Sequence, residues 1–416
     1  MNPRLVSYNQ LPSASRSPIT AGLKNVATKC SNATNASSDA RPEFTRHFHP
    51  NVWDGHDFTS TSSKHLIDER RLKELKKEVK NMFSLAAGDS FRELDLIDKI
   101  QRHGVAYHFE DEIEHILQRT NNDDYTHFFD QNICKNEHDV NLYYVSLRFR
   151  LLRQAGYYAV STDVFKKFKN EKGEFHANLA SDVQTMLSLY EASYLGFRGE
   201  DIMDEAMAFT TKHLNSMLTS LSSSPLALQV QHALMMPLQR IPERVYARYY
   251  IPIYDQEQNI SRNKTLMEFA KLDFNSLQLL HRNEINEVQK WWERMNIRSK
   301  LPYDVRDRVV EAYAITNNIY FEPQFSQARI HLAKLWVILT VIDDTYDVFG
   351  NLDELGQLCD AFQRWDANGT SHLSDAMKLV FVQVLKFFND IEADMIKGGN
   401  VVGVPFFKKE VYCLIN

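Results

Sequence analysis

The sequence predicts an all-α protein built from two helical parts. Apolar residues recur at spacings of three, four and seven along most of the chain, and strand-like alternation is missing. The 416 residues include only 14 Gly and 12 Pro, which argues against a turn-dense β protein. A chain of this length, with 44% hydrophobic residues, is expected to form two domains.

The composition excludes several classes of protein. A net charge of −6 gives no electrostatic reason to expect a nucleic-acid partner. The longest clean apolar run, Leu335–Ile342, is too short to span a bilayer. The four cysteines contain no CxxC pair, and no HExxH, GxGxxG or GxxxxGK[ST] string is present. Disulfide frameworks, zincins, Rossmann enzymes and P-loop NTPases are therefore not expected.

The first 40 residues differ from the rest. Met1–Ser38 contains four basic residues, no Asp or Glu, and much Ser, Thr and Asn. This composition is typical of an organelle transit peptide, and the lack of a continuous apolar core excludes a secretory signal. We expect residues 1–40 to be a leader that directs the protein to plastids. The alternative is a disordered tail on a cytoplasmic protein.

Each helix follows from its own apolar pattern. Gly104 and Gly156 close two of them as C′ residues, and Ser220–Pro225 is a loop by composition. A further helical element opens at Pro302. The N-terminal domain is placed at residues 41–255 and the C-terminal domain at 256–416. The expected helices before Pro302 are Asp68–Phe83, Leu94–His103, Asp139–Ala155, Asp182–Leu195, Gly199–Leu214, Thr265–Arg282 and Arg282–Arg294.

The chemistry is concentrated in the segment HLAKLWVILTVIDDTYD, from His331 to Asp347. On a helix Asp343 and Asp347 share one face, with Asp344 turned about 100° away. Both the like charges and the C-terminal helix dipole disfavour this arrangement, and no local residue compensates it. A cation would offset the cost, and oxygen-only ligands suit Mg²⁺ or Mn²⁺. DDxxD alone leaves an exposed acidic helix end as the alternative.

Two further features point to a diphosphate. Arg306 and Arg308 lie in the stretch PYDVRDRVVEAY, and arginine suits forked recognition of phosphate oxygens. Taken alone, Arg308 and Glu311 also fit an ordinary i,i+3 surface pair. Aromatic residues crowd the interval up to the aspartates and could line a pocket that stabilises a positive centre, or simply form core. Together the features favour ionisation of an allylic diphosphate. These aromatic residues are Tyr313, Tyr320, Phe321, Phe325 and Trp336.

Several longer strings carry a resemblance: FHPNVWDG, LLHRNEINEVQKWW, LPYDVRDRVVEAY, YFEPQFSQAR, VIDDTYDVFG and RWD. In order and spacing the chain resembles the plant class I terpene synthases from about residue 41 to about 409. The resemblance implies an N-terminal helical barrel-like domain whose N-terminal strand caps the active site, and an incomplete C-terminal class I terpenoid synthase domain. It implies a carbon–oxygen lyase acting on a prenyl diphosphate, and a monomer.

The resemblance also implies roles for particular residues. Asp343, Asp344 and Asp347 correspond to the metal-binding motif, for Mg²⁺ or in its place Mn²⁺. Arg306 and Arg308, together with Asp343 and Asp347, correspond to the diphosphate site. Positions lining the cavity would be Tyr313, Ile315 and Tyr346.

The chain departs from the family pattern in three places. Glu43 and Phe44 stand where a tandem arginine is usual, and Ile315 stands where a tryptophan is common. The second metal motif, (N/D)DxxSxxxE, is not found, because Asn389-Asp390 is followed by Ala393 and Lys397. We therefore expect little or no turnover from this chain, and exposed apolar helices that favour association with another chain.

The substrate has three candidates. FHPNVWDG and QLLHRNEINEVQKWW resemble the sesquiterpene branch, which places farnesyl diphosphate first. The leader favours a plastid, which would suit a casbene-type enzyme acting on geranylgeranyl diphosphate or, third, an enzyme acting on geranyl diphosphate. Two rival functions remain. An isoprenyl diphosphate synthase should carry two aspartate-rich motifs, and a non-catalytic helical protein would act by association.

Overall fold

The structure is a computed structural model, and it describes residues 48–58, 69–122, 139–221, 224–256, 263–365, 370–399, 401–406 and 409. All structural statements refer to these residues. The expected leader, the departures at Glu43 and Phe44, the arginines on either side of them (Arg41 and Arg46), and Asp366 of the RWD string lie outside them.

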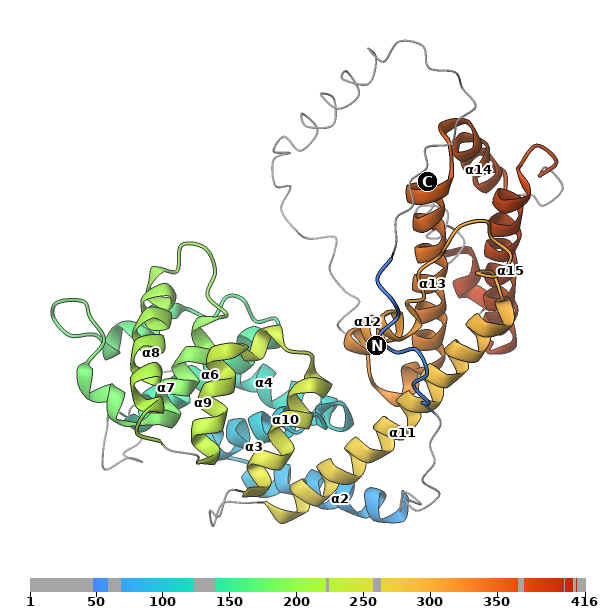
Figure 1. Cartoon of the computed structure of the whole chain (residues 1–416). Helices are drawn as coiled ribbons and strands as arrows, with labels where there is room; N and C mark the ends of the chain where they lie inside the picture. The colour runs from blue at the N-terminus through green and yellow to red at the C-terminus, as the bar shows by residue number, and fades with distance from the viewer. Residues whose placement is uncertain are drawn as a thin grey trace, which may run out of the picture.

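The described residues form helices joined by turns, with one isolated bridge between Lys169 and Phe175, so the all-α prediction is confirmed. Figure 1 shows two helical bodies, with α11 running from one to the other. The N-terminal body contains α2 (Glu69–Ala86), α3 (Ser90–Arg102), α4 (Glu110–Asn122), α6 (Asp139–Gln154), α7 (Val183–Ser193), α8 (Asp201–Leu218), α9 (Pro225–Met235) and α10 (Glu243–Gln256). The C-terminal body contains the rest of α11 (Lys264–Met295), then α12 (Val309–Ile319), α13 (Ser326–Asp344), α14 (Leu352–Arg364) and α15 (Asp375–Lys397).

Local sequence signals set the ends of several helices. Gly104 follows α3 with a φ of +69°, and a Cβ there would lie 2.9 Å from the Cβ of Ala247. Glycine is therefore required both by conformation and by space. Ser224 caps α9 by accepting a hydrogen bond from the backbone N–H of Ala227, with Pro225 in the first turn. The loop expected over Ser220–Pro225 thus ends where α9 begins.

Helix α11 differs from the prediction because it is one continuous helix of 32 residues, not two that meet at Arg282. The two cores divide within it. Leu266 to Ala270 pack into the N-terminal core, whereas Val288 and Trp292 pack into the C-terminal core. The first turns of α11 therefore belong to the body that precedes the expected boundary at residue 255. One rigid helix sets the position of one body against the other.

The element expected from Pro302 also differs. Residues 302–308 are not helical, and α12 begins only at Val309. Arg306 and Arg308 consequently lie in a non-helical stretch that leads into the helix. The backbone N–H of Arg306 is therefore not used inside α12 and can donate to a side chain outside that helix.

One segment, Pro323–Phe349, is long and apolar enough to pass a membrane-span test by length and composition. The core helix of a water-soluble protein passes the same test, so this finding is weak evidence for a transmembrane helix. Val337, Ile338 and Val341 of this segment are buried in the C-terminal core.

Candidate functional site

The end of α13 holds the three aspartates of the DDxxD string. Asp343 and Asp347 are exposed, whereas Asp344 and Thr345 are completely buried. The α-helix ends at Asp344 and continues as a π-turn over Thr345–Phe349, in which the N–H of Gly350 donates to the carbonyl of Thr345 at 3.0 Å. The continuous α-helix expected up to Asp347 is therefore wrong by one turn. A π-turn inside a helix is rare and frequently marks a functional site.

The π-turn changes the angle around the helix axis between the exposed residues Asp343 and Asp347. In a regular α-helix, residues four apart are offset by about 40° around the axis. A π-turn fits more residues into each turn, so Asp347 is expected closer to a line directly above Asp343. A shared face for Asp343 and Asp347 is therefore still expected, although the backbone between them is not a regular α-helix.

Arg306 compensates the charge at this helix end. Its backbone N–H and its Nε donate to the two oxygens of Asp344 at 2.8 and 2.6 Å, and its Nη2 donates to Oδ2 of Asp343 at 2.5 Å. In the part of the chain that the structure describes, no residue close in sequence pairs with Asp343 or Asp344, as expected, and the compensating partner comes from 37 residues upstream. Burial raises the pKa of Asp344, and the hydrogen bonds from Arg306 oppose that rise.

The aspartates thus differ in what they can bind. Asp344 is committed to Arg306 and does not reach solvent, which departs from its expected place among the metal ligands. Among the described residues no group of three or more His, Cys, Asp or Glu side chains is arranged to hold a metal. Asp343 and Asp347 nevertheless fit Mg²⁺, which keeps several waters and binds through one or two carboxylates plus substrate phosphates.

The two arginines of the expected diphosphate site have different surroundings. Arg306 lies beside Asp343, with 28% of its side chain exposed. Arg308 places Nη1 3.5 Å from Oε1 of Glu311, in the i,i+3 pair that the sequence allowed as an alternative. Both side chains are partly accessible. Only Arg306 is joined directly to the aspartates by these contacts.

The three residues expected to line the cavity differ in burial and do not face one common space. Tyr313 is 2% exposed and lies in the C-terminal core, with its hydroxyl donating to Oε2 of Glu284 at 2.6 Å. Ile315 is 45% exposed, on the opposite side of α12. Tyr346 is half-buried in the π-turn, with its hydroxyl 3.1 Å from Sγ of Cys359. Of the three, Ile315 has the accessible apolar surface that a substrate could contact.

Sequence reasoning missed a buried ion pair that fixes α13. Arg329 is completely buried and donates from Nε and Nη2 to the two oxygens of Glu284, each at 2.7 Å. Its Nη1 donates to the carbonyls of Tyr320 and Glu322. The available signal was position, because Glu284 lies four residues before Val288, on the apolar face of α11. The pair ties α11 to the start of the helix that carries the aspartates.

The N-terminal segment 48–58 reaches the same region. The ring of Phe48 covers the guanidinium of Arg306, with 5.2 Å between its centroid and Cζ. Figure 1 shows this segment beside α12 and α13, far from the body that contains α2 to α10. The described part of the segment forms a turn at residues 52–55 and no strand, unlike the capping strand that the resemblance implied.

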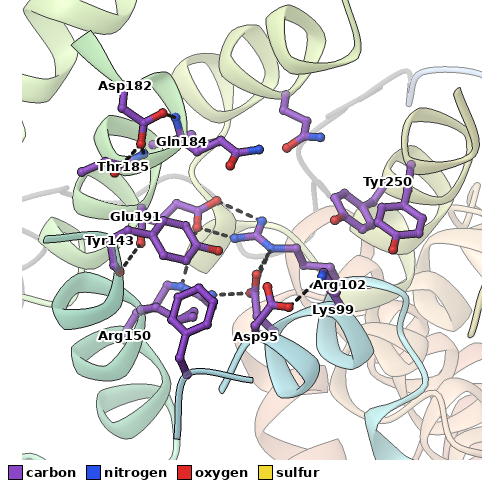
Figure 2. Close-up of a pocket in the computed structure, with 17 residues that line it drawn as sticks. Asp95, Lys99, Arg102, Tyr143, Arg150, Asp182, Gln184, Thr185, Glu191 and Tyr250 are labelled. Carbon is purple, nitrogen blue, oxygen red and sulfur yellow. Dashed lines mark hydrogen bonds and ion pairs between the residues drawn. The ribbon is translucent and has the colours of Figure 1, made fainter. Parts of the chain in front are cut away.

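Two described cavities lie elsewhere, in the N-terminal body. One of about 370 Å³ is walled by α3, α6, α7 and α10. Figure 2 shows Arg102 and Arg150 converging on Glu191 inside it. Both arginines also pair with Asp98, so two buried cations meet two buried anions and the cluster neutralises itself. A second cavity of about 870 Å³ is lined mainly by residues of the N-terminal body, and also by Phe321 and Glu322 of the segment that connects α12 to α13. The aspartates of the DDxxD string line neither.

Comparison with known proteins adds to this geometry. The family description "Terpene synthase, N-terminal domain" matches residues 43–234, and "Terpene synthase family, metal binding domain" matches residues 293–416. The chain is 45% identical to (-)-germacrene D synthase of Vitis vinifera over 382 residues, which cover 90% of this chain and 65% of the relative. It is 40% identical to sesquiterpene synthase 9 of Solanum lycopersicum, over 92% of this chain and 68% of the relative.

Comparison with solved structures gives the same kind of relatives as the sequence comparison. Isoprene synthase from grey poplar leaves, in complex with three Mg²⁺ ions and dimethylallyl-S-thiolodiphosphate, matches with a TM-score of 0.73 and 37% identity, over 84% of this chain and 64% of that one. A limonene synthase with 2-fluorolinalyl diphosphate matches with a TM-score of 0.74 and 34% identity, over 89% of this chain and 67% of that one. The chain spans about two thirds of the length of these proteins.

Proposed function

Because the chain belongs to the terpene synthase family, we propose that it takes part in the Mg²⁺-dependent ionisation of a prenyl diphosphate. Cleavage of the C–O bond releases diphosphate and leaves an allylic carbocation, which would become a terpene hydrocarbon by losing a proton or a terpene alcohol by adding water and losing a proton. The observation that carries the proposal is the end of α13, where the exposed carboxylate of Asp343 pairs with the guanidinium of Arg306 and the carboxylate of Asp347 is exposed four residues further on.

Each residue has a role in this proposal. Asp343 and Asp347 would hold Mg²⁺, which when bound neutralises charge on the diphosphate and stabilises it as a leaving group. Arg306 is already positioned by Asp344, so its accessible Nη2 can turn from Asp343 to a phosphate oxygen. Arg308, also partly exposed, would add a second cation. Mn²⁺, an equally oxygen-preferring ion, could replace Mg²⁺.

We propose farnesyl diphosphate as the first substrate, because sesquiterpene synthases are prominent among the similar proteins. Geranylgeranyl and geranyl diphosphate follow. The test is incubation of the purified chain with Mg²⁺ and each of the three diphosphates, with pyrophosphate release and gas chromatography of the extract as readouts. Because the second metal motif is not found, we expect slow release that needs Mg²⁺ and is fastest with farnesyl diphosphate. Equal release with and without a chelator would refute the proposal.

Plastid import is proposed on the composition of the leader alone. A fluorescent fusion of residues 1 to 45 should accumulate in plastids. A fusion that stays in the cytosol would refute import.

Action by association is the second candidate function. One observation favours it: the C-terminal body exposes large apolar side chains, with Ile319 52% and Trp336 40% accessible. Light scattering of the purified chain distinguishes the two candidates. A stable complex without Mg²⁺-dependent pyrophosphate release would favour association, and a monomer that releases pyrophosphate would exclude it.

A further inference from the structure

The stretch before α12 contacts the aspartate-bearing helix end at two points. Arg306 binds Asp343 and Asp344, as described above. Three residues earlier, Tyr303 lies against the π-turn itself. Its ring stacks on Phe349, with 4.4 Å between centroids and 22° between planes, and its hydroxyl lies 2.7 Å from Oγ1 of Thr345. The two contacts bracket the turn that carries Asp347.

The direction of the Tyr303 hydrogen bond follows from the second bond of Thr345. The Thr345 hydroxyl lies 2.6 Å from the carbonyl oxygen of Val341, which can only accept. The single proton of that hydroxyl is therefore used on Val341, and Tyr303 must donate to Thr345. Burial raises the pKa of Tyr303 to about 12, so the donor keeps its proton over the physiological range.

This chain of bonds acts where the α-helix changes into the π-turn. A threonine hydroxyl bonded to the carbonyl four residues earlier bends a helix, and Thr345 is the first residue of the π-turn. Tyr303 holds the Thr345 side chain from one side while its ring supports Phe349 at the far end of the turn. The separation of the Asp343 and Asp347 carboxylates depends on this turn.

From this geometry we propose that Tyr303 is a positioning residue for the metal-binding carboxylates. It sets the π-turn and thereby the spacing of Asp343 and Asp347. The proposal rests on the proposed function, because it assigns metal binding to those two carboxylates. Tyr303 itself touches neither metal nor substrate.

The variants separate the hydroxyl from the ring. Tyr303→Phe removes the hydrogen bond and keeps the stack on Phe349. Thr345→Val removes the acceptor at the other end of the same bond. Tyr249→Phe is the matched control, since its hydroxyl bonds the carbonyl of Leu228 in the N-terminal body. Loss of one such bond should lower the thermal midpoint by about 2–4 °C in Tyr303→Phe and in Tyr249→Phe. Thr345→Val also loses the bond to the carbonyl of Val341, so its thermal midpoint should fall further.

Two measurements decide the proposal. The first is hydrogen exchange of the amides of residues 345–350 without metal, which should quicken in Tyr303→Phe and not in Tyr249→Phe. The second is an electron paramagnetic resonance titration of Mn²⁺ with inorganic pyrophosphate. Partners one step removed from a ligand typically contribute about 10-fold or more to metal affinity. We therefore expect about 10-fold weaker Mn²⁺ binding in Tyr303→Phe and Thr345→Val, no further loss in the double variant, and unchanged binding in Tyr249→Phe.

The outcomes distinguish this proposal from the function on which it rests. A native chain that binds no Mn²⁺ with pyrophosphate refutes the proposed function. Native binding together with native affinity in Tyr303→Phe refutes only the role of Tyr303, as does unchanged exchange at residues 345–350.

Discussion

Replacing Arg329 with Met should strongly destabilise the C-terminal body. The substitution leaves Glu284 with a 4% exposed side chain and without its bidentate partner, while the hydrogen bond from Tyr313 remains. Breaking a buried ion pair by removing one member typically costs about 3–5 kcal/mol, because a charge stays buried without compensation. We expect a loss in this range in the free energy of unfolding.

The pH dependence gives this prediction a sign. Burial opposes ionisation of Glu284, but hydrogen bonds from Arg329, Ser326 and Tyr313 outweigh it and lower the pKa below the ordinary glutamate value. In the native chain this stability is present above the unfolded pKa of about 4.3 and is lost as the pH falls through the lower folded pKa. In Arg329→Met burial acts with less opposition and raises the pKa. The deficit against the native chain should therefore be largest near neutral pH and shrink on acidification.

Urea unfolding followed by tryptophan fluorescence measures the effect. Four of the five tryptophans lie at or after residue 291, so the signal reports mainly the C-terminal body. Two controls sharpen the result. Tyr313→Phe should cost only about 1 kcal/mol, and Glu284→Gln combined with Arg329→Met should recover much of the loss by removing the buried charge. A loss below about 1 kcal/mol in Arg329→Met, or a double variant as unstable as the single one, would refute the reasoning.

Three further predictions follow from the same structure. Arg306→Met should cost about 3 kcal/mol near pH 8, because Asp344 stays buried without its ion-pair partner; the loss should shrink as the pH falls through the raised pKa of Asp344 and its carboxyl takes up a proton, and a loss that does not change with pH would contradict this. Burial lowers the pKa of His103 to about 4, so it contributes stability above pH about 6.5 that is lost as the pH falls towards 4, at up to about 1.4 kcal/mol per pH unit. His103→Phe should flatten that slope in acid titrations followed by circular dichroism, and an unchanged slope would exclude His103 as its cause. Asp347→Asn should shift the thermal midpoint in calorimetry by no more than about 2 °C, because an exposed carboxylate contributes little to stability; a larger fall would give Asp347 a structural role.

The periodicity of apolar residues predicted the helices that bury one apolar face and expose the other. The patterns around Leu75 and Leu94 placed α2 and α3 within a few residues, since packing of one face defines such helices locally. Periodicity did not predict the backbone conformation where contacts with residues distant in the sequence determine it. Nothing before Val309 in the sequence shows that Arg306 lies outside the helix, because its backbone N–H is satisfied by Asp344, 38 residues away. The π-turn was missed for a similar reason, since its supports include Tyr303.

The candidate site shows the same limit. The DDxxD string identified Asp343 and Asp347, whose residue type and spacing carry the chemistry directly. It could not separate Asp344 from them, because burial depends on what packs against α13 and not on the string. Glu284 and Arg329 lay inside strings that carry the resemblance, yet their pairing joins residues 45 positions apart. The pattern of a single sequence does not show which of its charged side chains form ion pairs with one another.

Binding of metal and diphosphate to Asp343 and Asp347 is the central claim, and calorimetric titration of Mg²⁺ in the presence of inorganic pyrophosphate tests it most directly. The native chain should bind Mg²⁺ with pyrophosphate much more tightly than Mg²⁺ alone, because the phosphate oxygens complete the coordination. The variant Asp343→Asn/Asp347→Asn should lose this binding while keeping the native helical content by circular dichroism. Native affinity in the folded double variant would contradict the account, because the metal and diphosphate would then be held elsewhere.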